Sequence, residues 1–193
     1  MKIVIIDYGA GNIQSIKFAI QRLGFEAILS SDAEEIQKAD KVIFPGVGEA
    51  SSAIKKLNDS GLEPIIQNLT QPVLGICLGM QLMCNSSEEG NTKGLGIFDV
   101  DVVKFSEGVK VPQIGWNEIT ELKSGLFEAI PEKSYIYLVH SFYAPLSEDT
   151  IAISDYGLEY SAALQKGNFY GTQFHPEKSS EIGSKILQNF LEL

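Results

Sequence analysis

The first half of the chain alternates between two hydrophobic periods. A continuous β-branched run, KIVII at 2–6, is typical of a strand buried on both faces. The next segment, 12–24, has Ile13, Ile16, Ile20 and Leu23 at helical spacing and Gly24 as a stop. The same periods predict strands at 25–29, 41–44 and 72–76, and helices at 33–39, 50–57, 62–69 and 78–84. Strands that alternate with helices predict right-handed crossovers and a parallel sheet covered on both sides.

The pattern changes after residue 95. Short β-type segments separated by turn residues are predicted at 97–105, 115–120, 134–139, 151–154, 161–165 and 168–174. They favour an antiparallel or mixed extension of the sheet. The chain ends in a predicted amphipathic helix with Ile182, Ile186 and Phe190 on one face. Neither a repeat nor a linker divides the chain, so the pattern predicts one α/β domain over 1–193.

Composition narrows the classes of partner. Fifteen basic and 25 acidic side chains give a net charge of −10, which repels phosphate backbones and anionic membranes, so we expect neither nucleic acid nor a membrane as partner. The first apolar run meets Asp7, too early for a signal peptide, and no apolar stretch is long enough to span a bilayer. Two cysteines seven positions apart do not predict a disulfide framework. We expect a cytoplasmic protein.

Cys77 stands between a predicted strand and a predicted helix in PVLGICLGMQLM at 72–83. Gly75 and Gly79 flank Cys77 in a G-x-C-x-G pattern that is typical of a nucleophile elbow. In such an elbow, small neighbouring residues allow a sharp turn, and the reactive side chain protrudes at the carboxyl end of the sheet. The helix N-terminus favours the thiolate, and the Leu78 N–H is placed to donate to an oxyanion. The alternative is a cysteine buried as a small hydrophobic residue.

A base for this thiol is found in FHPEKS at 174–179. Pro176 disfavours helix at the preceding residue, so we expect an extended segment in which His175 and Glu177 project from the same face. The carboxylate would then accept the imidazole Nδ1–H and leave Nε2 for the thiol. The predicted triad is Cys77–His175–Glu177. The alternative is an ordinary His-Pro-Glu turn.

The remaining candidates are weaker. His140 has no neighbouring carboxylate and is predicted to be structural or to support the site, and Cys84 is predicted to lie mid-helix in the core. We predict no metal and no cofactor, because the chain lacks a C-x-x-C pair, a Walker loop and a complete glycine fingerprint at 9–11. The segment Pro45-Gly46-Val47-Gly48 can supply a second oxyanion donor or form a plain glycine turn.

Several motifs together resemble a known family over the whole chain: DYGAGN, FPGVGEA, GICLGMQLM, GWN, VHSFY and GTQFHPEKS. They are similar to class I (triad) glutamine amidotransferases, and more narrowly to the glutaminase subunits of imidazole glycerol phosphate synthases. With this resemblance, we expect a three-layer, flavodoxin-like α/β fold. Its mostly parallel central sheet would be extended by antiparallel strands in the second half.

The resemblance implies hydrolysis of glutamine to glutamate and ammonia. Cys77 would attack the carboxamide, His175 would transfer protons and Glu177 would orient the histidine. Matching positions imply that an oxyanion strand and a set of substrate contacts complete the site. The oxyanion strand is Gly46, Val47 and Gly48, and the substrate contacts are Gln81, Glu89, Ser141 and Phe142. From the sequence alone, Glu89 can equally be a solvated surface carboxylate.

A synthase partner with a (β/α)8 barrel, which receives the ammonia in histidine biosynthesis, is also implied by the resemblance. The family's interface positions match Asn12, Trp116, Asn117, Tyr137 and Lys178. Trp116 can equally be a core residue. The family often has a histidine where Gln113 stands.

Two other functions stay open at this point. One is a paralogous glutaminase that supplies ammonia to a synthase of surface-sugar biosynthesis, which the neighbouring genes would distinguish. The other is a non-catalytic flavodoxin-like binding module, for which Cys77 would be dispensable and unreactive.

Overall fold

A computed structural model describes residues 1–9, 11–106 and 108–193, so Ala10 of the DYGAGN motif lies outside the described residues. The helices are α1 (Ile13–Arg22), α2 (Ala33–Gln37), α3 (Ala50–Ser60), α4 (Glu63–Gln67), α5 (Leu78–Met83) and α6 (Ser180–Glu192). Short 3-10 turns form η1 (Glu89–Asn91), η2 (Gly125–Phe127) and η3 (Pro176–Lys178). Gly24 follows α1 with φ of +85°, as expected of a residue that stops a helix.

The strands of the first half are β1 (Ile3–Ile6), β2 (Ala27–Ser30), β3 (Lys41–Gly46), β4 (Val73–Cys77), β5 (Cys84–Ser87) and β6 (Thr92–Lys93). Those of the second half are β7 (Phe98–Lys104), β8 (Gln113–Ile119), β9 (Ser134–His140), β10 (Phe142–Tyr143), β11 (Thr150–Asp155), β12 (Glu159–Lys166) and β13 (Phe169–Thr172).

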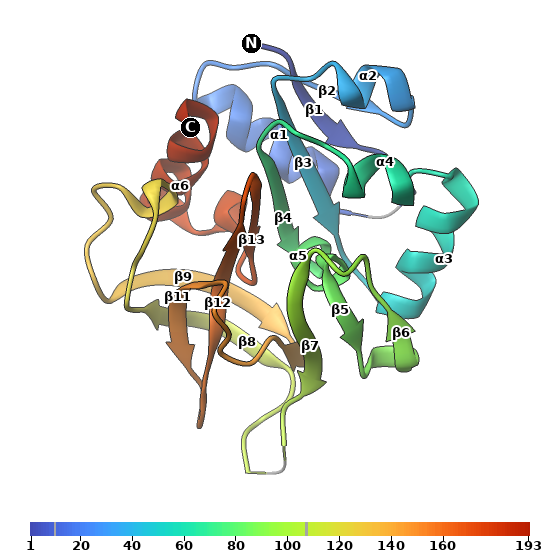
Figure 1. Ribbon diagram of the computed structural model, residues 1–193. Coiled ribbons are helices and arrows are strands. Elements are labelled where there is room, and N and C mark those ends of the chain that lie inside the picture. Colours follow the sequence, from blue (N-terminus) through green and yellow to red (C-terminus); the bar gives the residue numbers. More distant parts are fainter. Residues whose placement is uncertain (10, 107) are drawn as a thin grey trace.

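The main sheet has seven strands in the order β11-β12-β13-β4-β3-β1-β2 (Figure 1). The strands from β13 to β2 are parallel, whereas β12 and β11 continue the sheet in antiparallel pairing. β4 therefore lies in the middle, and its carboxyl end is flanked by the carboxyl ends of β3 and β13. Ligands bind at this edge in parallel α/β sheets.

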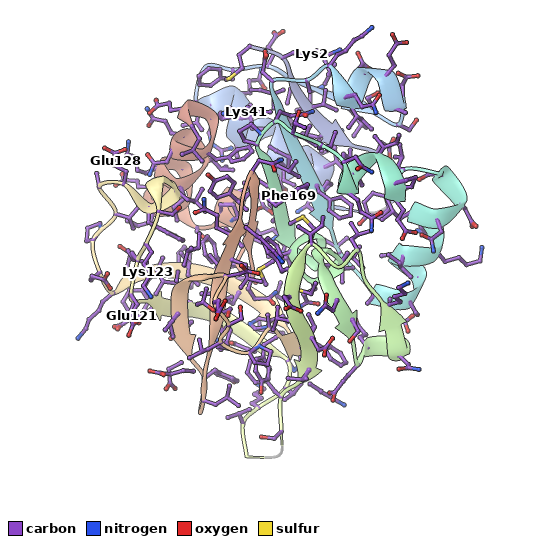
Figure 2. All side chains as sticks on the ribbon, in the orientation of Figure 1. Lys2, Lys41, Glu121, Lys123, Glu128 and Phe169 are labelled. Atoms are coloured by element: carbon purple, nitrogen blue, oxygen red, sulfur yellow. The ribbon has the colours of Figure 1, made fainter. Side chains whose placement is uncertain are left out.

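Two hydrophobic cores cover the two faces of the sheet. One joins β1 to α1, α6 and the β8–β9 pair, through residues such as Ile5, Ile20 and Phe190. The other joins the opposite face to α2, α3, α4, α5 and β7, through residues such as Ile6 and Phe98. Side chains fill the space between these layers, while those of Glu121 and Lys123 project outward after β8 (Figure 2). The predicted three-layer α/β fold is confirmed.

Some element predictions were wrong. The second strand begins at Ala27 rather than at residue 25, and it forms the edge of the sheet, where Ile28 and Leu29 are exposed. Cys84 is buried but is not mid-helix, because the helix ends at Met83 and Cys84 opens β5, which pairs with β7. The β-type segments after residue 95 only partly extend the main sheet. β7 and β10 join β5 and β6 in a second sheet, and β8 pairs with β9 in a third.

None of the helices in the described ranges combines the length and the hydropathy that a membrane crossing requires.

Candidate active site

The predicted nucleophile elbow is built by glycines. Cys77 ends the central strand β4 with φ of +55° and ψ of −111°, a strained conformation for a residue with a Cβ, and α5 begins at the next residue. A Cβ at Gly79 would overlap the Phe44 carbonyl oxygen, one at Gly75 would overlap the end of the Met83 side chain, and one at Gly46 would overlap the Gly79 backbone. The glycines therefore let α5 begin directly against β3 and β4.

Cys77 is 7% exposed, and its sulfur lies near two polar groups, one on β9 and one just after β13. Its Sγ lies 3.9 Å from the Val139 carbonyl oxygen of β9 and 3.8 Å from Nε2 of Gln173, which follows β13. His175 lines the same cavity as Cys77.

The imidazole of His175 is held by Glu177. Nδ1 of His175 lies 2.8 Å from Oε1 of Glu177, and both side chains are buried. The segment between them is not extended as predicted. Pro176 is the first residue of η3, because its fixed φ also suits the start of a helical turn. The two side chains meet through this turn, since His175 itself remains extended.

The charges around His175 favour its protonated form. Burial by itself lowers the pKa of His175, but the interactions with the Cys77 and Glu177 side chains outweigh it and raise the pKa to about 9. An imidazolium at this position stabilises a neighbouring thiolate. The pair is therefore suited to nucleophilic attack followed by proton transfer.

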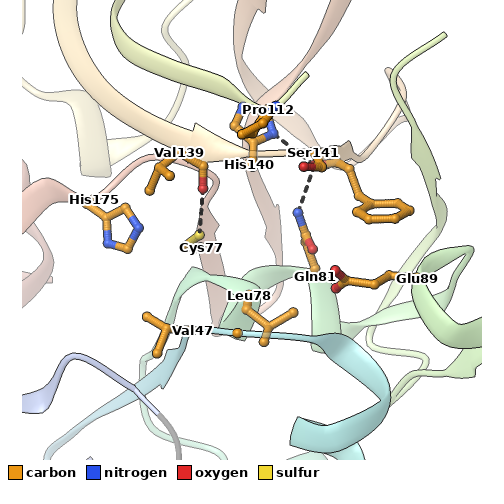
Figure 3. Close-up of a pocket in the computed structure, with 12 residues that line it drawn as sticks. Val47, Cys77, Leu78, Gln81, Glu89, Pro112, Val139, His140, Ser141 and His175 are labelled. Atoms are coloured by element: carbon orange, nitrogen blue, oxygen red, sulfur yellow. Dashed lines mark hydrogen bonds between the residues drawn. The ribbon is translucent and has the colours of Figure 1, made fainter. Parts of the chain in front are cut away.

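A cavity of about 360 Å³ opens in front of this pair (Figure 3). Nine of the predicted site residues line it: Val47, Gly48, Cys77, Leu78, Gln81, Glu89, Ser141, Phe142 and His175. Gly46 lies behind the wall, packed on α5, and Glu177 lies behind His175. Pro112, Val139 and His140 also line the cavity, and the sequence did not predict them as lining residues.

Gln81 and Glu89 occupy one end of the cavity. The Gln81 Nε2 donates to the Phe142 carbonyl at 2.9 Å and to Gln173 Oε1 at 2.8 Å, so only its Oε1 remains free to accept. Glu89 is half-buried rather than a fully solvated carboxylate, and its Oε2 accepts from the Ala50 N–H at the start of α3. Burial raises the pKa of Glu89, the Ala50 N–H lowers it and the charge of Glu49 raises it again, with a net increase.

His140 is a neutral support of this cavity. Burial lowers the pKa of His140 to about 4, so at neutral pH its Nδ1–H donates to the Phe142 carbonyl, 2.8 Å away. Nε2 lies 3.4 Å from the Tyr160 hydroxyl, which donates to Gln113 Oε1 at 3.0 Å. His140 and Gln81 thus fix the same carbonyl oxygen from two sides.

The predicted oxyanion strand is anchored at the residue directly before it, Pro45. The Tyr8 hydroxyl donates to the Pro45 carbonyl at 2.8 Å, and burial of Tyr8, with the charge of Cys77, raises the pKa of the phenol. Pro45 and Gly46 pair with Ile76 and Cys77 as part of β3. Val47 is exposed beyond them, and Gly48 has φ of +93°. Glycine adopts this φ without strain, whereas residues with a Cβ rarely adopt it.

Three of the five predicted interface residues contact one another at the surface. The Trp116 and Tyr137 rings are 6.0 Å apart, and Lys178 Nζ lies 6.0 Å from the Tyr137 ring centre. Trp116 is 52% exposed, so it is not a core residue. The Asn117 side chain forms hydrogen bonds within the chain: its Nδ2 donates to the Asp155 carbonyl, and its Oδ1 accepts from the Glu118 N–H. Asn12 precedes α1, which packs against η3.

Two supporting residues were missed by the sequence analysis. Gln173 is fully buried beside Cys77, and Ser179 is fully buried behind His175. The Ser179 hydroxyl donates to the His175 carbonyl at 2.7 Å and accepts from the Tyr137 N–H at 2.9 Å, which ties η3 to β9. Neither residue carried a sequence signal of its own, because each directly follows another polar residue, Thr172 or Lys178. In the described part of the chain, no group of three or more His, Cys, Asp and Glu side chains is arranged to hold a metal ion.

A cysteine at a strand–helix elbow beside a buried His–Glu pair is the arrangement of a triad enzyme that works through a covalent intermediate. The model of the family "Glutamine amidotransferase class-I" matches residues 4–193. The chain therefore belongs to the class I glutamine amidotransferase family and is a glutamine amidotransferase.

Curated relatives share its whole length. The imidazole glycerol phosphate synthase subunit HisH of Bacteroides fragilis is 56% identical, with 100% of both chains covered. The HisH subunit of Haemophilus influenzae is 47% identical over 100% of this chain and 98% of its own.

Solved structures share the fold. A putative GMP synthase subunit from Thermoplasma acidophilum matches with a TM-score of 0.77 and 23% identity, covering 100% of this chain and 92% of its own. PurLQS from Thermotoga maritima matches with a TM-score of 0.75 and 20% identity, covering 99% and 97%.

Proposed function

We propose that this chain is the glutaminase subunit of an imidazole glycerol phosphate synthase, with one glutaminase domain over 1–193. The observation that carries the proposal is the strained Cys77 elbow, which opens into a cavity beside the His175–Glu177 pair. Full-length similarity to HisH subunits supports this choice over the surface-sugar paralogue. Membership of an enzyme family argues against a non-catalytic binding module.

The cavity suits the two ends of glutamine. Glu89 and the free Oε1 of Gln81 are acceptors at one end and would bind the α-ammonium group. The backbone of Ser141 and Phe142, fixed by His140, would hold the amino-acid end from the other side. The side-chain carboxamide would then reach Cys77.

Acylation begins with attack of the Cys77 thiolate on the carboxamide carbon. A sulfur–carbon bond forms, and the carbonyl oxygen becomes an oxyanion that the Leu78 N–H and an amide of Gly46–Val47–Gly48 would bind. His175 gives its proton to the leaving nitrogen as the carbon–nitrogen bond breaks. Ammonia leaves, and a glutamyl thioester remains on Cys77.

Deacylation uses the same groups. Neutral His175, oriented by Glu177, takes a proton from water as the water oxygen attacks the thioester carbon. The sulfur–carbon bond then breaks, glutamate leaves, and the thiolate–imidazolium pair is restored. The net reaction consumes one glutamine and one water and yields glutamate and ammonia.

The ammonia would pass to a (β/α)8 synthase subunit in a cytoplasmic heterodimer of histidine biosynthesis. The proposed docking surface is the outer face of β8 and β9, which carries Ile114, Trp116, Tyr135 and Tyr137, with Lys178 beside it. Val139 lies on the same face and also lines the cavity. A partner seated there would be adjacent to the carbon–nitrogen bond that breaks.

Glutamate release from glutamine tests the proposal. It is measured for wild type and Cys77→Ala, each with and without a barrel synthase partner that carries its acceptor ligand. Cys84→Ala is the matched control, because Cys84 is buried away from the cavity. We expect turnover that requires both Cys77 and the partner.

Each outcome has a distinct meaning. Turnover that survives Cys77→Ala overturns the proposed nucleophile. Turnover that is equally fast without the partner leaves the triad but removes the proposed activation by the synthase. A wild-type protein that is inactive with a histidine-pathway synthase overturns the assignment to that pathway.

A further inference from the structure

Gln173 occupies a buried position between the nucleophile and the substrate-binding residue Gln81. It follows β13, the strand next to β4, and its side chain is fully buried. Its Nε2 lies 3.8 Å from Cys77 Sγ, and its Oε1 accepts from Gln81 Nε2 at 2.8 Å. The proposed glutaminase reaction above gives Gln173 no role.

The neighbours of Gln173 fix which end of its amide faces the sulfur. Gln81 uses one amide hydrogen on the Phe142 carbonyl and the other on Gln173 Oε1. The oxygen of Gln173 is therefore on the Gln81 side, and its NH₂ group is on the Cys77 side. A buried amide donor needs an acceptor, and the sulfur provides one.

Besides His175, two groups lie near the sulfur, of which one favours the thiol and the other favours the thiolate. The Val139 carbonyl oxygen, 3.9 Å away, can accept from an S–H but repels a thiolate. The Gln173 NH₂ has the opposite preference, because a donor gains strength when its acceptor becomes charged. Unlike His175, it keeps its hydrogens throughout the catalytic cycle.

We infer that Gln173 is a hydrogen-bond donor to the Cys77 thiolate and couples the nucleophile to the substrate-binding residue Gln81. It stabilises the thiolate before attack and again when the sulfur leaves the glutamyl group during deacylation. The catalytic part of this inference rests on the proposed glutaminase function, whereas the contact with the sulfur does not.

The test is the variant Gln173→Glu, with Gln165→Glu as the matched control. Glutamate at 173 keeps an oxygen for Gln81 but replaces the donor beside the sulfur. Gln165 is half-buried on the adjacent strand β12 and donates to the Tyr170 hydroxyl, away from the cavity. The first readout is alkylation of Cys77 by iodoacetamide at pH 7 in the isolated subunit, followed by peptide mass spectrometry. It requires no glutamine turnover, so it remains decisive if the proposed function fails.

We expect Gln173→Glu to slow alkylation of Cys77 about tenfold, as for loss of a hydrogen bond to a charged group, while Gln165→Glu alkylates at the wild-type rate. In the complex with the synthase, the kcat of Gln173→Glu for glutamine hydrolysis should also fall about tenfold. KM should stay within about twofold, because Gln81 keeps its acceptor. Gln173→Met should reproduce the alkylation result.

Unchanged alkylation of Cys77 in both Gln173 variants overturns the inference. Cys84 reports on folding, because it is fully buried and reacts only when the protein opens. If either variant exposes Cys84, the wild type decides the question by nuclear magnetic resonance. The side-chain amide signal of Gln173 should then move with ionisation of Cys77, and a signal that does not follow it overturns the inference.

Discussion

The α-carbon of Gly79 faces the carbonyl oxygen of Phe44 so closely that no methyl group fits between them. Gly79 lies in the first turn of α5, two residues after Cys77, and Phe44 lies in β3. This contact sets the depth at which the helix begins behind the nucleophile. The orientation of the Cys77 side chain therefore depends on a residue that does not line the cavity.

Gly79→Ala is expected to destabilise the protein by about 1–3 kcal/mol, because the new methyl group must push the elbow away from β3. Alkylation of Cys77 and glutamine turnover should both fall at least tenfold. Gly125→Ala is the control, since its methyl group meets only the end of the Leu193 side chain. Chemical unfolding and the two activity measurements check the prediction. Full activity in Gly79→Ala would contradict it.

Glu177→Gln removes the charge beside His175 while keeping the size of the side chain. The amide can still contact Nδ1, but it no longer stabilises the imidazolium. We expect kcat for glutamine hydrolysis to fall about a hundredfold or more, with a smaller change in KM. Steady-state kinetics of the complex measures this. Glu181→Gln, which removes an exposed charge from the first turn of α6, should retain the wild-type rate. Equal rates for the two variants would exclude a catalytic role for the Glu177 charge.

The two histidines predict opposite pH dependences of stability. The pKa of His175 is raised to about 9, so the folded state holds a proton that the unfolded state loses above about pH 6.5. The stabilisation from this group is present below that pH and is lost as pH rises toward 9. We expect wild type to lose stability over this range and His175→Gln to lose less. Urea unfolding at several pH values measures the slope, and identical slopes would contradict the prediction.

Protonation of His140 affects the stability of the fold in the acidic pH range. Its pKa is lowered to about 4 by burial, so between about pH 6.5 and 4 only the unfolded state takes up the proton. This group therefore makes the free energy of unfolding fall by about 1.4 kcal/mol per pH unit as pH decreases through that window. His140→Gln should remove that part of the slope. Urea unfolding between pH 6.5 and 4 checks it, and a slope as steep as that of wild type would show that His140 titrates normally.

The parallel part of the fold could be predicted because its strands are buried on both faces. β1, β3 and β4 are continuous apolar runs, and the helices between them have clear apolar stripes. β5 could not be predicted, because Leu82, Met83 and Cys84 continue the apolar pattern of α5. The β5 residues form a strand because they pair with β7, and β7 comes later in the chain, so the local sequence gives no indication of the pairing.

The site shows the same limit. The spacing of Gly75 and Gly79 predicted the Cys77 elbow, because the close packing at these positions leaves no room for a Cβ. The His175–Glu177 contact was predicted from an extended segment, yet it forms through a turn that Pro176 begins. Gln173 and Ser179 carried no signal of their own. Their positions depend on how β13 and η3 meet β4 and β9, which only the tertiary structure defines.

Trp116→Ala tests the proposed docking surface. Trp116 is 52% exposed on β8 and meets the Tyr137 ring edge-on, so its removal should leave the fold intact. Large aromatic side chains at the centre of an interface often contribute about 2 kcal/mol or more to binding. We therefore expect the dissociation constant for the synthase to rise at least about tenfold. Alkylation of Cys77 in the isolated protein should not change.

Phe18→Ala is the matched control for this experiment. Phe18 is 55% exposed on α1, outside the β8–β9 face, so its loss removes a similar apolar area from a different surface. Isothermal titration of each variant with the synthase compares the two surfaces under the same conditions. If Trp116→Ala binds as tightly as wild type while Phe18→Ala binds weakly, the partner docks on α1 instead. The route for ammonia would then have to start from a different side of Cys77.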